Sequence, residues 1–247
     1  MGATPVETPY LSASLKSREE ICEGTMAFRF EKPAGWNFKA GQAMDMTLLD
    51  PPETDSEGNT RAFSIASAPE EDTLMIATRM RDTAFKRTLK RLPIGSRVKI
   101  EGPFGGLTLH NNNAKAAVLL AGGIGITPFR SMVVRAAREK LAHRIFLFYS
   151  NRRPEDAAFL QELQELEKDN PNYKLIATMT GMQGSSRPWQ GETGRVSSEL
   201  LSKHLKQAAS PIYYVAGPPE MVKALHETVN RCGVDDDDIR IEEFAGY

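Results

Sequence analysis

Cysteine is scarce in this sequence, and its scarcity excludes several kinds of redox and metal site. The 247 residues include two cysteines, Cys22 and Cys232, and they do not form a CxxC pair. Two thiols are too few for a Cys₄ iron–sulfur cluster or a disulfide framework, and zinc-ribbon and thioredoxin-like motifs need CxxC. The four histidines form no HExxH or HxxxH pair. The sequence therefore predicts no metal site.

Long apolar runs and an excess of one charge are missing as well. The longest apolar run, residues 116–121, is far shorter than the roughly 20 residues of a membrane span, and the N-terminus lacks a signal-peptide pattern. The 31 Lys+Arg and 32 Asp+Glu leave a formal charge of -1, so no basic field favours nucleic acid or an anionic membrane. We expect a cytoplasmic globular protein without a nucleic-acid or membrane partner.

The first part of the chain carries short strand-like segments separated by turn signals. Alternating or β-branched apolar residues fall at 44–49, 62–66, 73–78 and 97–100. A helical pattern at 82–91 interrupts them. Evenly spaced short strands predict an antiparallel barrel or sandwich.

After the polar segment 110–113 the pattern changes to buried strands alternating with helices, which predicts a parallel doubly wound sheet. Thr127 is expected to cap a helix whose first residue is Pro128, and a second helix is expected to open at Pro218-Pro219. Phe159, Leu163 and Leu166 form a third helical stripe. The expected strands are 116–121, 144–149, 173–179 and 211–216.

Residues 121–128, AGGIGITP, follow a buried strand and run into a helix. Gly122, Gly123 and Gly125 permit a tight turn and a close approach of the backbone to a ligand. The helix that follows directs free N–H groups and the positive end of its dipole at one point, where a pyrophosphate fits. A glycine-rich connector without a ligand is the structural alternative for this segment alone.

The tetrapeptide 61–64, RAFS, begins a strand in the first part of the chain. Arginine, an aromatic ring and a hydroxyl at this spacing suit a planar ligand that carries phosphate. Taken alone, an ordinary strand with one exposed arginine explains the tetrapeptide equally well.

Five motifs together resemble the ferredoxin–NADP reductase family of flavoprotein oxidoreductases. They match in order and spacing, and they are RAFSIASAP at 61–69, GPFGGLTL at 102–109, AGGIGITP at 121–128, FYSNRRPED at 148–156 and YYVAGPPEM at 213–221. The resemblance implies an antiparallel β-barrel FAD-binding domain, residues 1–112, followed by an α/β doubly wound NAD(P)-binding domain, residues 113–247. It also implies an NAD(P)H-dependent flavoprotein reductase.

The resemblance implies which residues of the barrel hold FAD. Arg61 corresponds to the position on the pyrophosphate, Phe63 to the ring against the isoalloxazine, and Ser64 to a catalytic hydroxyl near flavin N5. Lys86 stands where the family usually has a serine, so phosphate binding there needs its charge or main-chain N–H groups. The other FAD-binding positions implied are Ala62, Ile76, Ala77, Thr78, Ala84 and Phe85.

In the second domain the resemblance assigns Thr127 a catalytic place close to flavin and nicotinamide, and Tyr247 the place of a terminal aromatic residue over the flavin. Phe63 replaces the usual tyrosine, Ala216 the usual cysteine, and Ala245 stands where plant-type reductases have glutamate. Phe63 and the pair Ala216-Gly217 also resemble the corresponding residues of stand-alone NAD(P)H:flavin reductases. The remaining cofactor-binding positions are Gly122, Gly123, Gly125, Ile126, Pro128, Gly217, Pro218, Met221 and Phe244.

Coenzyme choice is predicted from the segment Asn151-Arg152-Arg153, which follows the second strand of this domain. Arginines there favour the 2′-phosphate of NADP over the ribose diol of NAD, although a solvated basic turn is the alternative and NAD remains possible. Arg187, in the polar loop 181–194, is a second residue for the same phosphate.

The electron acceptor must be a separate molecule, because the cysteines cannot hold a cluster. We expect a ferredoxin- or flavodoxin-type carrier, steered by basic residues around 79–91, or, in a flavin reductase, free flavin. A solvated helix face is the alternative for the basic residues. A nucleotide-sensing or electron-transfer subunit without its own turnover is a third hypothesis for the function.

Overall fold

The first half of the chain folds as an antiparallel barrel, as predicted from the sequence. In the computed structural model, which describes residues 11–206, 208 and 210–244, the strand order is β4-β3-β6-β1-β2-β5. The Ala66 N–H donates to the Met75 oxygen over 2.8 Å, which joins the two ends of the sheet. The strands are β1 (Leu11–Cys22), β2 (Thr25–Glu31), β3 (Ala43–Leu48), β4 (Thr60–Ser64), β5 (Thr73–Arg79) and β6 (Arg97–Phe104), and the helix is α1 (Ala84–Arg91).

Apolar alternation explains most of these strands but not β1. In β3, Met44, Met46 and Leu48 are buried while the residues between them are partly exposed, which is the period of two that a strand requires. In β1 only Ala13 and Leu15 are buried, and the other ten residues are partly or fully exposed. A strand with so few buried apolar residues carries no periodic signal, so the sequence did not predict it.

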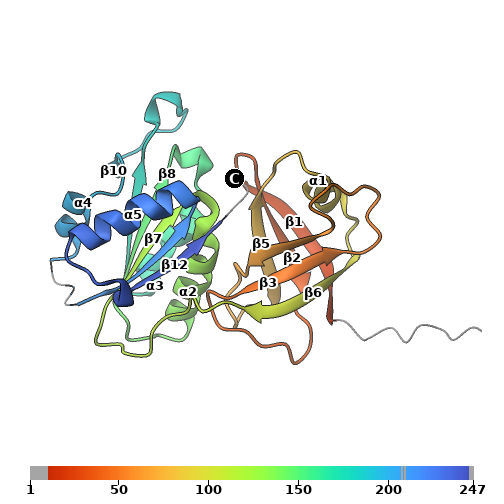
Figure 1. The fold of residues 1–247 in the computed structure, drawn as a ribbon, viewed down its shortest axis with the longest axis horizontal. Coiled ribbons are helices and arrows are strands. Elements are labelled where there is room, and N and C mark those ends of the chain that lie inside the picture. Colours follow the sequence, from red (N-terminus) through yellow and green to blue (C-terminus); the bar gives the residue numbers. More distant parts are fainter. Residues whose placement is uncertain (1–10, 207, 209, 245–247) are drawn as a thin grey trace, which may run out of the picture.

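The second half forms a parallel sheet of order β10-β9-β8-β7-β11-β12, which confirms the predicted doubly wound domain. Figure 1 shows this domain beside the barrel, with β12 leading the chain back toward it. The strands are β7 (Ala117–Gly122), β8 (Ile145–Asn151), β9 (Tyr173–Met179), β10 (Glu192–Thr193), β11 (Ile212–Gly217) and β12 (Ile239–Glu243). The helices are α2 (Ile126–Arg138), α3 (Leu160–Asp169), α4 (Ser198–His204) and α5 (Pro219–Arg231).

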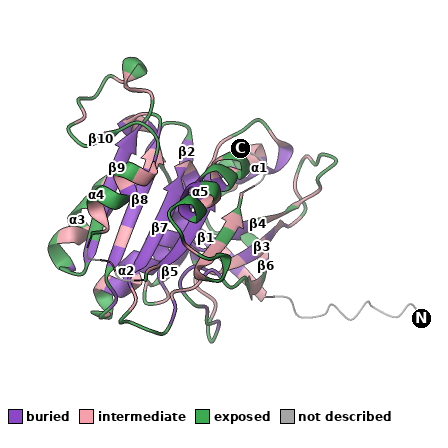
Figure 2. Ribbon diagram, turned by 60° about the vertical axis from the view of Figure 1, so that its left-hand side comes forward, coloured by how far each residue is buried: buried purple, intermediate pink, exposed green. Residues whose placement is uncertain are grey.

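The helices cover both faces of this sheet, and β7 is buried on each (Figure 2). Leu119 packs in a cluster with Phe129 of α2 and Leu163 of α3. Its neighbour Leu120 packs with Val222 of α5 in a different cluster. Burial of successive residues on opposite faces explains why this strand is a continuous apolar run in the sequence.

One predicted helix start is wrong, and one residue of the predicted helical stripe lies outside its helix. The short 3₁₀ turn η1 (Gly123–Gly125) continues directly into α2, so Thr127 lies inside the helix, and its hydroxyl donates to the Ile124 oxygen over 3.1 Å instead of capping. Phe159 precedes α3 with a φ of 59°, so it is not part of a helical stripe. The predicted start at Pro218-Pro219 is confirmed, because α5 begins at Pro219.

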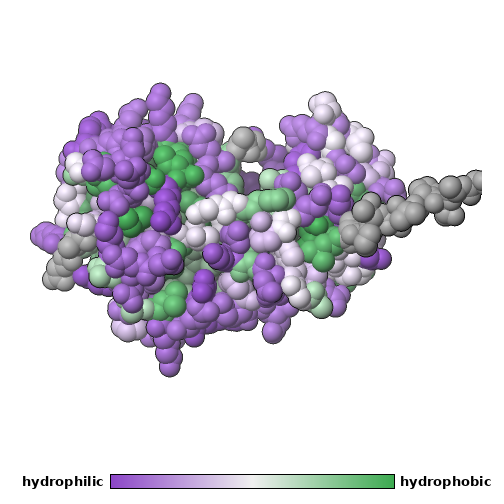
Figure 3. Space-filling view, turned by 60° about the horizontal axis from the view of Figure 1, so that its bottom comes forward, coloured by the Kyte–Doolittle hydropathy of each residue, from purple (hydrophilic) through white to green (hydrophobic). Residues whose placement is uncertain are grey.

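The face drawn in Figure 3 is largely hydrophilic, with separate groups of apolar side chains on it. Among the described residues, Ile94, Phe104 and Ile241 are the large hydrophobic side chains that are exposed. No described helix combines the length and the apolar character needed to cross a bilayer.

Candidate functional site

A cavity of about 460 Å³ opens at the barrel where β4, β5 and α1 meet the first turn of the second domain. We call it the flavin cavity. Its lining combines residues predicted to bind FAD with the hydroxyl of Thr127. The lining residues are Glu57, Arg61, Ala62, Phe63, Ser64, Ala77, Thr78, Arg79, Arg81, Thr83, Lys86, Ile124, Thr127 and Phe244.

Beside the flavin cavity, donors of Arg61 and of the α1 start hold a carboxylate of the chain itself. The carboxylate of Asp55 accepts from Arg61 Nη2 over 3.3 Å and from the Ala84 N–H, at the start of α1, over 3.0 Å. Desolvation opposes ionisation of Asp55, but these donors and the Glu57 N–H outweigh it and keep its pKa below the usual value. An anionic group therefore sits between the Arg61 guanidinium and the positive end of a helix.

Three cationic side chains, Arg61, Arg81 and Lys86, line the flavin cavity. Burial, followed by the charges of Arg81 and Arg61, lowers the pKa of the Lys86 ammonium. Arg61 also donates to the carbonyls of Glu57 and Gly58 over 2.9 and 3.0 Å, which holds it at the cavity edge. This donor set has the chemistry that a pyrophosphate needs.

The cavity lining also includes a nearly buried aromatic ring, that of Phe63. The Phe63 ring is 9% exposed and lies 5.9 Å from the Phe85 ring, centroid to centroid. Phe63 therefore lines the cavity, while Phe85, the predicted binding residue behind it, belongs to the barrel core. A flat ring system fits against such an apolar face.

Glu242 is a site residue that was not predicted from the sequence. The Ser64 hydroxyl donates to Glu242 Oε1 over 3.2 Å, and burial raises the pKa of this carboxyl. An acid was sought two residues before Tyr247, where the chain has Ala245. The sequence does have a glutamate two residues before a different aromatic residue near the C-terminus, namely Glu242 before Phe244. Phe244 lines the cavity, so this pair was the sequence signal that could have identified Glu242.

A second cavity, of about 950 Å³, lies beyond the carboxyl ends of the parallel strands, and we call it the coenzyme cavity. Gly122 and Gly123 line it from the end of β7, and Gly123 has a φ of 53°. Its other lining residues are Arg79, Arg81, Ser150, Asn151, Arg152, Arg153, Asp156, Thr180, Gly181, Gln183, Gly184, Arg195, Pro218 and Met221.

The backbone beneath the coenzyme cavity is packed too closely for side chains. A Cβ on Gly125 would lie 2.3 Å from the Ala216 oxygen and 2.7 Å from the Gly217 Cα. The glycine therefore lets the turn before α2 contact the end of β11. This contact leaves the N–H groups of the helix start directed at the cavity, which suits a dinucleotide phosphate.

The arginines of the coenzyme cavity differ in what they bind. Arg153 pairs with Asp156 over 2.9 Å and with Glu23 of the barrel over 2.7 Å. Within the described part of the chain, no ion pair involves Arg152 or Arg195. Arg152 and Arg195 are thus available to a ligand, and Arg195 was not among the predicted residues.

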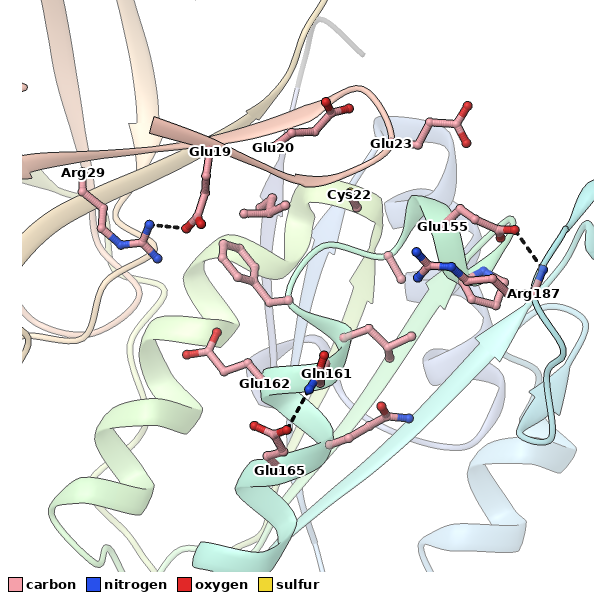
Figure 4. A pocket seen from close by; sticks show the side chains of 16 residues that line it. Glu19, Glu20, Cys22, Glu23, Arg29, Glu155, Gln161, Glu162, Glu165 and Arg187 are labelled. Atoms are coloured by element: carbon pink, nitrogen blue, oxygen red, sulfur yellow. Dashed lines mark hydrogen bonds and ion pairs between the residues drawn. The ribbon is translucent and has the colours of Figure 1, made fainter. Parts of the chain in front are cut away.

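Several predicted residues lie outside both cavities. Arg187 borders a third groove, of about 980 Å³, where its N–H donates to Glu155 over 3.1 Å (Figure 4). Tyr247 lies outside the described residues. The predicted residues whose side chains or backbone are buried behind the cavities are Ile76, Ala84, Phe85, Gly125, Ile126, Pro128 and Ala216, and Gly217 is buried beside them.

Comparison with known proteins identifies both halves. The oxidoreductase FAD-binding domain matches residues 12–109, and the oxidoreductase NAD-binding domain matches residues 119–227. A subunit of the Na(+)-translocating NADH-quinone reductase of Methylococcus capsulatus is 28% identical over 202 residues, which are 75% of this chain and 49% of that protein. The same subunit of Haemophilus influenzae is 30% identical over 201 residues, which are 75% and 48%. The chain thus spans about half the length of these relatives.

Solved structures share the fold. A ferredoxin NADP+ reductase from Neisseria gonorrhoeae with bound FAD and NADP superposes with a TM-score of 0.77 at 22% identity, covering 96% of this chain and 99% of that one. The cytochrome P450 reductase GcoB of Amycolatopsis gives a TM-score of 0.79 at 20% identity, covering 96% of this chain and 70% of that one. At these identities the comparison shows the two-domain architecture.

Proposed function

Because the chain belongs to the oxidoreductases that combine an FAD-binding with an NAD-binding domain, and shares the fold of a ferredoxin NADP+ reductase, we propose that it takes hydride from NAD(P)H onto bound FAD and passes the electrons to a separate acceptor. One observation carries the proposal. The turn from Gly122 to Thr127 borders both cavities, with Gly122 and Gly123 in the coenzyme cavity and Ile124 and Thr127 in the flavin cavity. A nicotinamide bound on this turn would therefore face the flavin.

When bound, FAD supplies an acceptor for hydride at N5 and can release electrons one at a time. The chain contributes alignment and electrostatics, because hydride transfer needs no side-chain nucleophile. Ser64 and Thr127 both place hydroxyls in the lining of the flavin cavity, and Glu242 fixes the hydroxyl of Ser64. Arg61 and Lys86 would hold the pyrophosphate, and Phe63 would exclude water from the ring.

We further propose that NADPH is the preferred coenzyme. The double substitution Arg152→Ala and Arg195→Ala should raise the KM for NADPH at least about tenfold, because the loss of even one charge-assisted hydrogen bond costs about 1.5–3 kcal/mol. The KM for NADH should stay within about twofold, since NADH lacks the 2′-phosphate. Steady-state kinetics with both coenzymes measure this directly.

Arg187→Ala is the matched control for coenzyme choice, because Arg187 lies in the third groove. It should leave both KM values unchanged. If the KM values for NADPH and NADH rose equally in the double variant, Arg152 and Arg195 would not be the residues that bind the 2′-phosphate. The relatives are named as NADH enzymes, and the Neisseria structure holds NADP, so their names do not decide the preference.

The acceptor is proposed to be a small acidic electron carrier that docks on the basic face of α1. Lys90 and Arg91 are exposed there, but Arg87 pairs with Glu53 and Asp82, so the basic face is smaller than the sequence indicated. The double reversal Lys90→Glu and Arg91→Glu should slow reduction of a plant-type ferredoxin about tenfold at low salt by removing electrostatic steering.

The proposed docking face has a matched control variant and an outcome that would exclude it. Lys223→Glu, an exposed lysine on α5, should leave ferredoxin reduction unchanged. Ferredoxin reduction that is equally fast in the Lys90 and Arg91 double variant would exclude this docking face.

The relatives are named as part of a Na(+)-translocating NADH-quinone reductase, which offers a different class of acceptor. The predicted cytoplasmic location and the predicted absence of a membrane partner stay predictions.

A stand-alone flavin reductase is the second candidate function, favoured by Phe63 and Ala216 at positions where the ferredoxin reductases usually carry tyrosine and cysteine. The two functions differ in flavin retention. Purification of the protein with one FAD per chain supports the proposed function. A colourless protein that oxidises NADPH only when FMN or riboflavin is added supports the second candidate.

A further inference from the structure

Arg130 is a buried arginine at the boundary between the two domains. It belongs to α2, and its side chain is 4% exposed. A guanidinium carries five N–H donors, and every one of them has an acceptor here. Nε donates to Glu162 Oε2 over 2.8 Å, Nη1 to the Ala66 oxygen and to Glu71 Oε2 over 2.8 Å each, and Nη2 to Glu71 Oε1 over 3.1 Å and to Glu162 Oε1.

These acceptors come from both domains. Ala66 and Glu71 lie in the barrel segment between β4 and β5, whereas Glu162 lies in α3, where Figure 4 shows it below the β1–β2 hairpin. The Arg130 guanidinium also lies 5.1 Å from the centre of the Phe159 ring. Each carboxylate is bound through both oxygens, so the guanidinium fixes direction as well as distance.

The charges at this contact depend on one another. Burial opposes ionisation of Glu71, but hydrogen bonds and charge from Arg130 outweigh it, and the pKa of Glu71 lies below the usual value. Burial of an ion pair costs desolvation energy that a well-packed apolar side chain would avoid. A gain in stability therefore does not by itself explain an arginine at this position. An arginine that holds the two domains in one relative orientation does explain it.

The contact joins the two segments that line the flavin cavity. Arg130 lies one turn after Thr127, and the Ala66 carbonyl it binds lies two residues after Ser64. The next residue of α2, Ser131, donates to the Ser67 oxygen over 2.7 Å. The segment that carries Thr127 is thus tied directly to the segment that carries Ser64.

We propose that Arg130 is a positioning residue that holds α2 against the barrel and thereby sets the rate of hydride transfer, not the affinity for the coenzyme. This inference rests on the proposed function. Arg130 does not line the coenzyme cavity, so its loss removes no direct contact with the coenzyme. The separation of the reacting atoms depends on the domain contact, and a displacement of about 1 Å can cost about 100-fold in rate.

Two conservative substitutions separate the two halves of the contact. Glu71→Gln weakens the half that crosses between domains, and Glu162→Gln weakens the half within the second domain. Stopped-flow reduction of the FAD-loaded protein should be at least about tenfold slower in the Glu71 variant, with the NADP+ dissociation constant from calorimetry within about twofold of wild type. The Glu162 variant should keep its rate within about threefold.

Arg130→Lys tests the same point with a cation that cannot bind two carboxylates through both oxygens. Its hydride-transfer rate should fall between wild type and Arg130→Met. The Lys174→Gln variant, which loses an ion pair with Glu167 that lies within the second domain, should match wild type. Equal rates in the Glu71 and Glu162 variants, or a loss of NADP+ affinity as large as the loss of rate, would overturn the proposal.

A readout without FAD or coenzyme tests the domain contact by itself. Scanning calorimetry of the flavin-free protein should show one unfolding transition for wild type and two for the Glu71 and Arg130 variants, because their domains unfold separately. A single unchanged transition in these variants would contradict the role in domain positioning. If wild type oxidises neither coenzyme, the proposed function fails, and calorimetry still decides the structural part.

Discussion

Replacing Gly125 with alanine is expected to weaken NADP+ binding by about 100-fold. The new Cβ would meet the backbone of Ala216 and Gly217 at 2.3 to 2.7 Å, and backbone atoms cannot turn away as a flexible side chain can. The turn before α2 must shift, which costs about 1–3 kcal/mol and moves the N–H groups that face the coenzyme cavity. Calorimetric titration with NADP+ measures the affinity, and thermal unfolding measures the accompanying loss of stability.

Gly106→Ala is the matched control for this substitution, because a Cβ there meets no atom within 4 Å. It should leave both NADP+ affinity and the unfolding temperature unchanged. An NADP+ affinity within about threefold of wild type in the Gly125 variant would mean that the turn does not contact the coenzyme, since about 1.4 kcal/mol corresponds to a factor of ten.

Replacing Arg61 with alanine is expected to lower FAD affinity by about 100-fold, because charge-assisted hydrogen bonds to phosphate are worth about 1.5–3 kcal/mol each. Asp55→Asn should act in the opposite direction. The carboxylate of Asp55 occupies the donors of Arg61 and of Ala84 that the pyrophosphate would use. Loss of its charge should therefore leave FAD affinity unchanged or raise it. Fluorescence titration of the flavin-free variants with FAD measures both effects.

Arg97→Ala is the control for Arg61, since it removes a barrel arginine whose partner is Ser12 on the adjacent strand. It should bind FAD as wild type does. If Arg61→Ala retained FAD while Asp55→Asn lost it, the placement of the pyrophosphate beside Arg61 would be contradicted.

The sequence predicted the site where the chemistry is local. The turn at 122–125 and the strand at 61–64 are short segments whose residue types suit a ligand. Gly122, Gly123, Ile124 and residues 61–64 line the two cavities. The barrel and the parallel sheet followed from their different apolar periods. These features need no knowledge of distant residues.

The features that the sequence did not predict depend on distant contacts. Ser64 and Glu242 are 178 positions apart, and only the return of β12 to the barrel brings them together. Arg130 carries a residue type that is usually exposed, so nothing in α2 marks it as buried at a domain boundary. Asp55 lies in a turn that looks like an ordinary polar loop until Arg61 and α1 are placed around it.

Anaerobic titration of the purified protein with NADPH and NADH tests the central claim most directly. We predict that FAD stays bound at about one per chain, because residues from several elements line the flavin cavity, and that about one equivalent of NADPH bleaches it, with NADH less effective. A protein whose bound flavin is bleached by neither coenzyme, or that retains no flavin at all, would contradict the claim that the two cavities together transfer hydride from NAD(P)H to FAD.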